Sequence, residues 1–134
     1  MNKIIVDTNI FIYALDWNSK YHEQSVKLIT SDKYDLYTTS KNISEYLAVS
    51  TKMNIDKTKI LDFLEDINRN VSLLYSTPRS SKIFIQLFEK YFPAGNRVHD
   101  IEIASIALAG KIKSIATFNT KDFHQIDEIK LLKL

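Results

Sequence analysis

Acidic side chains stand at four widely separated points of this 134-residue sequence, each next to the end of a predicted strand or helix. Asp7 follows the β-branched run 3–6, and Glu45 lies in the helical segment after the second predicted strand. Asp100 precedes an apolar helical segment, and Asp122 follows the fourth predicted strand. Ligands of parallel sheets bind beyond the carboxyl ends of the strands. We therefore expect the four carboxyl groups to face one edge of the sheet.

Such a cluster of carboxyl groups is typical of a site for a hard divalent cation. Neighbouring carboxylates raise each other's pKa unless a cation neutralises them, and oxygen ligands favour Mg²⁺ or Mn²⁺. We expect Asp7, Glu45 and Asp100 to bind the metal, with either Asn119 or Asp122 completing the pocket. A pair of such ions can activate water and stabilise both the attacking and the leaving oxygen of a phosphodiester.

Three further residues are candidates for supporting roles. The hydroxyl groups of Thr8 and Thr117 would orient carboxylates or water. Arg97 is a candidate for binding a phosphate group of the substrate, and a solvated surface charge is the alternative interpretation.

Each acid also has a purely structural interpretation. Asp7 and Asp100 could cap the helices that follow them, and Asp122 could be a turn residue. The segment 42–45 resembles a capping box, with Asn42 as the N-cap and Glu45 at the third helical position. Helix caps have no reason to converge on one edge of a sheet, whereas metal ligands must. The joint pattern therefore favours the metal site.

Other chemistries lack their required residues. There is no cysteine, which excludes thiol catalysis, and two glycines are too few for a glycine-rich phosphate loop. The three histidines, His22, His99 and His124, have no paired spacing that would indicate zinc, and no GxSxG motif indicates a serine hydrolase. A phosphatase of the haloacid dehalogenase kind would need a second aspartate two residues after Asp7, where this chain has Asn9.

Strands that alternate with helices predict an α/β domain with a mainly parallel sheet. The length predicts a single domain over residues 1–134, because no linker, repeat or charge block divides the sequence. Ser19 is a candidate N-cap for the second helix, and Asp56 for the fourth. The predicted strands cover residues 3–6, 35–39, 71–75, 114–118 and 129–132, and the main helices 8–15, 19–30, 41–52, a segment after 56, 80–92 and 101–112.

The composition is that of an ordinary soluble globular protein, with 45% hydrophobic and 25% charged residues. The net charge of +2 is too small to argue for nucleic acid by itself. No apolar run is long enough to span a bilayer, so we expect a soluble, cytoplasmic protein without membrane contact. The aromatic segments around Phe63 and from Phe84 to Phe92 suggest a homodimer face, and core packing is the alternative.

Four segments of the sequence resemble the motifs of the PIN-domain family, in particular the VapC-type toxins. The segment IIVDTNIFIYAL is similar to the N-terminal motif, with its acid on Asp7 and its hydroxyl on Thr8. SEYLAV places the second acid on Glu45, and VHDIEIASIAL places the third on Asp100. SIATFNTKDFHQI resembles the C-terminal motif, although many members carry aspartate near the position of Asn119. The four motifs occur in the expected order along the whole chain.

This resemblance implies a three-layer α/β/α fold and a Mg²⁺-dependent endoribonuclease, the toxin of a type II toxin–antitoxin pair. It also implies a homodimer and a cognate antitoxin protein that blocks the site. RNA as the substrate comes from the resemblance alone. Because Asn119 replaces an acid, the alternative is a catalytically inactive PIN-like module that binds a partner protein.

Overall fold

The computed structural model describes residues 1–134 and contains five strands and seven helices. It confirms the predicted alternation of strands and helices. The strands are β1 (Asn2–Val6), β2 (Tyr34–Thr39), β3 (Ser72–Leu74), β4 (Ser114–Ala116) and β5 (Lys130–Leu132). The helices are α1 (Thr8–Leu15), α2 (His22–Ile29), α3 (Ser40–Lys52), α4 (Lys57–Asn70), α5 (Pro78–Tyr91), α6 (Arg97–Ala109) and α7 (Thr120–Phe123).

The five strands form one parallel sheet in the order β3-β2-β1-β4-β5. The predicted parallel sheet is confirmed, and every neighbouring pair in it is parallel. The chain moves from β1 to β2 on one side and later returns to β4 on the other side of β1. The strand order therefore reverses between β1 and β4, and ligands of open α/β sheets bind at such a switch point.

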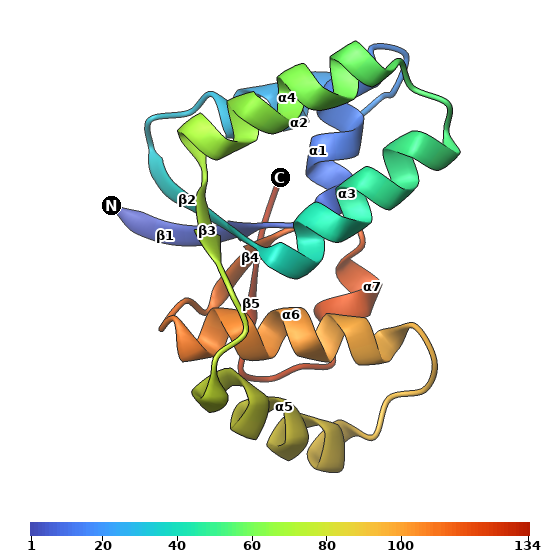
Figure 1. Cartoon of the computed structure of the whole chain (residues 1–134). Helices are drawn as coiled ribbons and strands as arrows, with labels where there is room; N and C mark the ends of the chain where they lie inside the picture. Colours follow the sequence, from blue (N-terminus) through green and yellow to red (C-terminus); the bar gives the residue numbers. More distant parts are fainter.

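Helices cover both faces of the sheet, which gives the three layers (Figure 1). Because successive side chains of a strand point to opposite faces, β1 contributes to two separate cores. Ile4 and Val6 pack in a cluster with residues of α1, α2, α3 and α4. Ile5 packs in a second cluster with residues of α5, α6 and α7. Each core fixes one set of helices against the central strand, whose carboxyl end carries Asp7.

The predicted starts of α2 and α3 are wrong. α2 begins at His22, and Ser19 is not its N-cap, because the Ser19 hydroxyl accepts the N–H of Tyr21 in the preceding turn. α3 begins at Ser40, directly after the second strand. Its N-cap is Thr39, which forms a capping box with Asn42 at the third helical position. The local signal for a capped helix was correct, but the cap lies three residues earlier than predicted.

α6 also begins earlier than predicted, at Arg97. Asp100 therefore lies inside the first helical turn, and its interpretation as an N-cap is wrong. Asn96 holds the cap position without a side-chain hydrogen bond. The prediction that Asp56 caps α4 is confirmed, since its carboxylate accepts the N–H of Thr58 at 3.1 Å.

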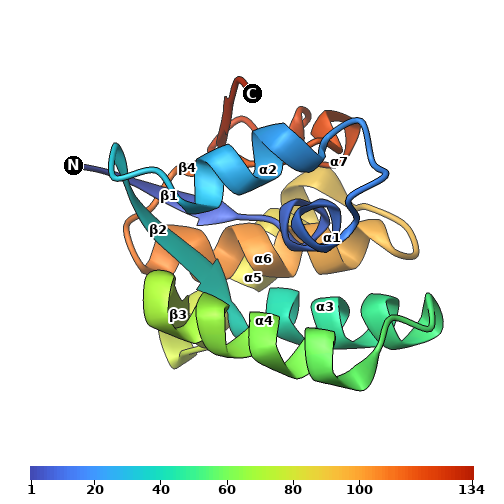
Figure 2. The same ribbon diagram turned by 90° about the horizontal axis from the view of Figure 1, so that it is seen from above.

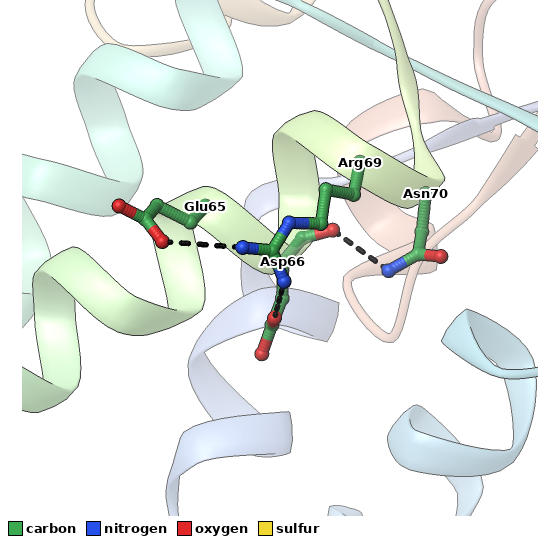
Figure 3. A network of polar contacts seen from close by, with 4 residues as sticks. All are labelled: Glu65, Asp66, Arg69 and Asn70. Carbon is green, nitrogen blue, oxygen red and sulfur yellow. Dashed lines mark hydrogen bonds and ion pairs between the residues drawn. The ribbon is translucent and has the colours of Figure 1, made fainter.

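The outer face of α4 is polar and carries a small network of contacts (Figure 3). Arg69 lies 3.5 Å from Glu65 and 3.9 Å from Asp66, and the Asn70 amide donates to the Asp66 carbonyl oxygen at 2.9 Å. The Arg69, Glu65 and Asp66 side chains are exposed, so these ion pairs contribute little to stability.

None of the seven helices has both the length and the apolar character needed to cross a bilayer.

Candidate active site

The fold brings all four predicted acids to one cavity. The cavity has a volume of about 270 Å³ and lies at the carboxyl end of β1, next to the switch point. Asp7 comes directly after β1, α3 supplies Glu45, α6 supplies Asp100 and α7 supplies Asp122. Acidic residues that only capped their own helices would not need to line one common cavity. The complete lining is Asp7, Thr8, Asn9, Ile12, Tyr13, Glu45, Val49, Asp100, Asn119 and Asp122.

Asp7 is held in place by four hydrogen bonds. One carboxylate oxygen accepts the N–H of Thr8 at 2.9 Å and the side-chain amide of Asn42 at 3.0 Å. The other accepts the Thr117 hydroxyl at 2.7 Å and the Asn9 amide at 3.2 Å. Only 6% of Asp7 is exposed. Donors from α1, from α3 and from Thr117, directly after β4, therefore fix the orientation of this carboxyl group before any ligand binds.

The Thr8 hydroxyl connects the first acid motif to the second. It donates to the Glu45 carboxylate at 3.1 Å and lies 3.2 Å from the Asn42 carbonyl oxygen. The Asn42 amide in turn donates to the Thr8 hydroxyl at 3.1 Å. Because the N–H of Asn42 bonds to Thr39, Glu45 has no part in the capping of α3. Its capping-box interpretation is wrong, and its side chain faces the acid cavity.

Two amide side chains at the site, those of Asn42 and Asn9, were not identified from the sequence. Asn42 is fully buried and was predicted only as a helix cap. Asn9 donates to both Asp7 and Thr117, and its side-chain oxygen accepts the N–H of Phe118 at 3.2 Å. The partners of both amides include residues tens of positions away in the chain, so local spacing carries no signal for them. The only hint for Asn9 was its place next to Asp7 in the DTN segment.

The acids in the cavity form no ion pair with a lysine or arginine. Burial is the main cause that raises the pKa of Asp7, against hydrogen bonds from Thr117 and Thr8 that lower it. Burial also raises the pKa of Asp100 to about 7, with smaller contributions from Asp122, Asp7 and Glu45. The ion pairs of the protein involve only Arg69 and Lys90 as cations. The cavity is therefore a place where a positive ion would be stabilised.

Arg97 lies beside this cavity and not in its lining. Its charge lowers the pKa of Asp100, and its guanidinium donates to Gln125 at 3.4 Å. Arg97 lines an adjoining cavity of about 530 Å³, which shares Asp122 with the acid cavity. His99 is exposed and does not line the acid cavity.

The donor chemistry fits a hard divalent ion, but the side chains as they stand do not form a finished chelate. Carboxylates and the amide of Asn119 are the oxygen donors that Mg²⁺ prefers. No three His, Cys, Asp or Glu side chains are placed closely enough to hold one ion together. Asp7 is fixed by its four bonds. Metal binding therefore requires other acids to rotate towards it.

Residues 4–129 match the sequence model of the PIN domain. The chain belongs to the PIN-domain family. No curated protein matches the sequence.

Solved structures share the fold of this PIN domain over almost its whole length. VapBC2 from Rickettsia felis, bound to a promoter DNA fragment, is 20% identical with a TM-score of 0.76 over 98% of each chain. VapC20 from Mycobacterium tuberculosis, a sarcin–ricin loop cleaving toxin, is 12% identical with a TM-score of 0.71, covering 95% of this chain and 98% of its own. VapBC-5 from the same organism, of a family of toxin–antitoxin systems, is 15% identical with a TM-score of 0.65 over 100% of each chain.

The pKa of Asp100 predicts how the stability of the metal-free PIN domain depends on pH. The folded chain holds this proton up to about pH 7, whereas an unfolded aspartate loses it near pH 3.9. The resulting stabilisation is complete below about pH 4 and is lost as the pH rises to about 7. Because Asp100 is only partly buried, the discounted loss is about 1–2 kcal/mol.

Urea unfolding in EDTA at several pH values between about 4 and about 8 measures this effect. The Asp100→Asn variant should show a smaller decrease in the free energy of unfolding than the wild type. Burial raises the pKa of Asp7 in the same direction, so a residual slope is expected in both proteins. Identical pH profiles for the two proteins would contradict the assignment of the raised pKa to Asp100.

Proposed function

We propose that this PIN domain is a Mg²⁺-dependent endoribonuclease and that it acts in the cytoplasm as the toxin of a type II toxin–antitoxin pair. The observation that carries the proposal is the convergence of four carboxyl groups from four parts of the chain on one cavity, where none of them forms an ion pair with a lysine or arginine. Mg²⁺ would be the natural cation, with Mn²⁺ as a substitute. The similarity in fold to a sarcin–ricin loop cleaving toxin supports RNA as the substrate.

In this proposal each residue has a defined task. Asp7, Glu45 and Asp100 hold the ion, and either Asn119 or Asp122 completes the set. The bound ion supplies Lewis-acid activation of water and stabilisation of the charge that develops on the phosphodiester.

The hydroxyl groups beside the acids keep them in position. Thr117 donates to Asp7 and would keep this carboxylate in its orientation when the site is loaded, and Thr8 donates to Glu45 and holds it at the cavity. Arg97, which lines the adjoining cavity, would bind an RNA phosphate.

RNA cleavage with and without divalent metal tests the proposal directly. We expect the purified chain to cut RNA internally with Mg²⁺ or Mn²⁺, to lose this activity in EDTA, and to regain it when Mg²⁺ is restored. Cleavage that persists in EDTA would contradict the metal-dependent mechanism. If no RNA is cut and calorimetry shows no Mn²⁺ binding that depends on Asp7 and Asp100, the chain is instead the inactive, protein-binding module.

The proposed antitoxin would find apolar surface next to the acid cavity. Val49 lines the cavity and is 40% exposed. Met53, four positions later at the end of α3, is 47% exposed. A protein segment that covers these side chains would block access to the acids. Co-expression with the product of the neighbouring reading frame tests this: the partner should co-purify and should inhibit RNA cleavage.

We also propose that two copies of the chain form a homodimer. Phe63 and Phe84 pack against the two cores, so core packing accounts for these two aromatics. Ile85 and Phe92 at α5 remain 53% and 75% exposed, and a second copy of the chain would cover them. Sedimentation at micromolar concentration tests this, and a clean monomer would contradict it.

A further inference from the structure

Two adjoining cavities lie along α2, lined by residues other than those of the acid cavity. The first, of about 380 Å³, is lined by Thr117, Phe118, Tyr21 and Gln24, among others. The second, of about 290 Å³, is lined by Gln24 and by several lysines. Both cavities share Gln24, Leu132, Lys133 and Leu134, so they adjoin. Because the Thr117 hydroxyl bonds to Asp7, the first cavity begins next to the acids. In Figure 2, α2 and α7 lie on the same side of the molecule.

An aromatic cluster forms the wall nearest to the acids. The rings of Tyr21 and Phe118 stack with their centroids 4.3 Å apart and an angle of 26° between their planes. Tyr13 contacts both rings, at 5.1 Å and 5.5 Å, and also lines the acid cavity. The Asn9 amide holds the backbone of Phe118 in place. Nucleic-acid-binding proteins use such rings to stack unpaired bases of any sequence.

The far end of the two cavities is basic. Lys27, Lys33 and Lys133 line it, all three are exposed, and none takes part in an ion pair. No aspartate or glutamate lines either cavity. This lining is the opposite of the acid cavity, where carboxylates dominate. A polyanion whose scissile group lies at the acids would therefore be favoured along this path and not repelled.

We propose that these residues form a basic–aromatic track, defined by Tyr21, Phe118, Lys27, Lys33 and Lys133, that holds an unpaired RNA segment next to the scissile bond. A base stacks on the Tyr21–Phe118 pair, and the lysines bind phosphates further along. α2 spans about 12 Å at 1.5 Å per residue, which suits a few nucleotides. The proposal rests on the proposed function, and it specifies single-stranded RNA, because paired bases cannot reach the rings.

Salt-dependent binding tests the lysines. The probe is a fluorescein-labelled single-stranded RNA of about 10 nucleotides, and anisotropy is measured in EDTA from about 50 to about 200 mM salt. Three phosphate contacts contribute about 2 to the slope of log K against log salt. The triple variant Lys27→Gln, Lys33→Gln, Lys133→Gln should lose that part of the slope and bind at least about tenfold more weakly. A matched variant with Lys52, Lys57 and Lys59 changed to Gln removes the same charge at the α3–α4 corner and should keep the slope.

Substitution of the aromatic wall tests the stacking. Tyr21→Leu should weaken binding of the same probe by at least about fivefold, and Tyr21→Phe should restore it. A duplex RNA of the same length should bind more weakly than the single strand. Equal salt slopes for the two triple variants, equal affinity for the duplex, or no binding by the wild-type chain would each overturn the track.

These assays show which of the two proposals is wrong, the basic–aromatic track or the nuclease function. If the wild-type chain binds the probe through the track but cuts no RNA with Mg²⁺, the nuclease proposal is wrong and the track stands. If the wild-type chain cuts RNA and the lysine variant binds and cuts like its control, the track is wrong and the nuclease stands.

Discussion

Replacement of Asp7 by alanine is expected to lower Mg²⁺-dependent RNA cleavage by at least about 10³-fold while the chain stays folded. A metal ion contributes several kcal/mol to the stabilisation of a phosphodiester transition state, and each 1.36 kcal/mol corresponds to a factor of ten. Asp7 is the one acid that four hydrogen bonds hold in a fixed orientation. In our proposal the other acids gather around an ion that it positions. Its loss should therefore remove most of this stabilisation.

The fold should tolerate this substitution. Burial already disfavours the charged form of Asp7, and the donors left behind border a cavity where water can replace the carboxylate. We expect the free energy of unfolding to change by no more than about 2 kcal/mol. Asp66→Ala is the matched control, since Asp66 lies in the exposed network of α4 (Figure 3) and its loss should leave cleavage unchanged. Activity that persists in well-folded Asp7→Ala and Asp100→Asn proteins would refute the mechanism.

Asn42→Ala is expected to lower cleavage by about 10- to 100-fold, the usual effect of removing a group that orients a metal ligand. The Asn42 amide donates to both Asp7 and Thr8, and thereby links the carboxylates of Asp7 and Glu45. It also forms the capping box with Thr39. We therefore expect a loss of stability of about 1–3 kcal/mol as well. The variant should need more Mg²⁺ for half-maximal cleavage than the wild-type chain does.

The Mg²⁺ concentration needed for half-maximal cleavage distinguishes an effect of Asn42 on the position of Asp7 from an effect on stability alone. Asn70→Ala is the matched control, because Asn70 also donates a side-chain amide hydrogen bond but lies on the surface of α4 (Figure 3). It should leave both the rate and the Mg²⁺ requirement unchanged. A variant of Asn42 that is less stable but has the wild-type Mg²⁺ requirement would show that the amide supports only the fold.

The sequence predicted the parallel α/β fold and the meeting of the acids because both follow from strong local patterns, whereas the three layers were implied by the resemblance to the PIN-domain family. The run before Asp7 is β-branched, and the apolar helices repeat with helical spacing. Parallel strands then place their carboxyl ends at one edge. α1 was predicted with its observed bounds, since Asp7 both ends the strand and accepts the N–H of Thr8.

The errors arose where one residue type fits two local patterns. Asn42 is a good N-cap residue, but Thr39 at the end of β2 takes that role and leaves no loop before α3. This shift by one helical turn places Asn42 beside Asp7 and directs Glu45 into the cavity. Contacts over 35 positions in the chain cannot be deduced from periodicity. For the same reason the sequence could not find Asn9 or choose between Asn119 and Asp122, which both line the cavity.

The central place of β1 has a consequence for how the chain is made. β1 lies between β2 and β4, and the bond from Thr117 to Asp7 joins residues 110 positions apart. On the ribosome, Asp7 is therefore synthesised 110 residues before Thr117, one of the partners that fix its orientation. In the proposed mechanism the acid cavity is complete only after Asp122 has been synthesised, so a shorter nascent chain should not cut the RNA around it.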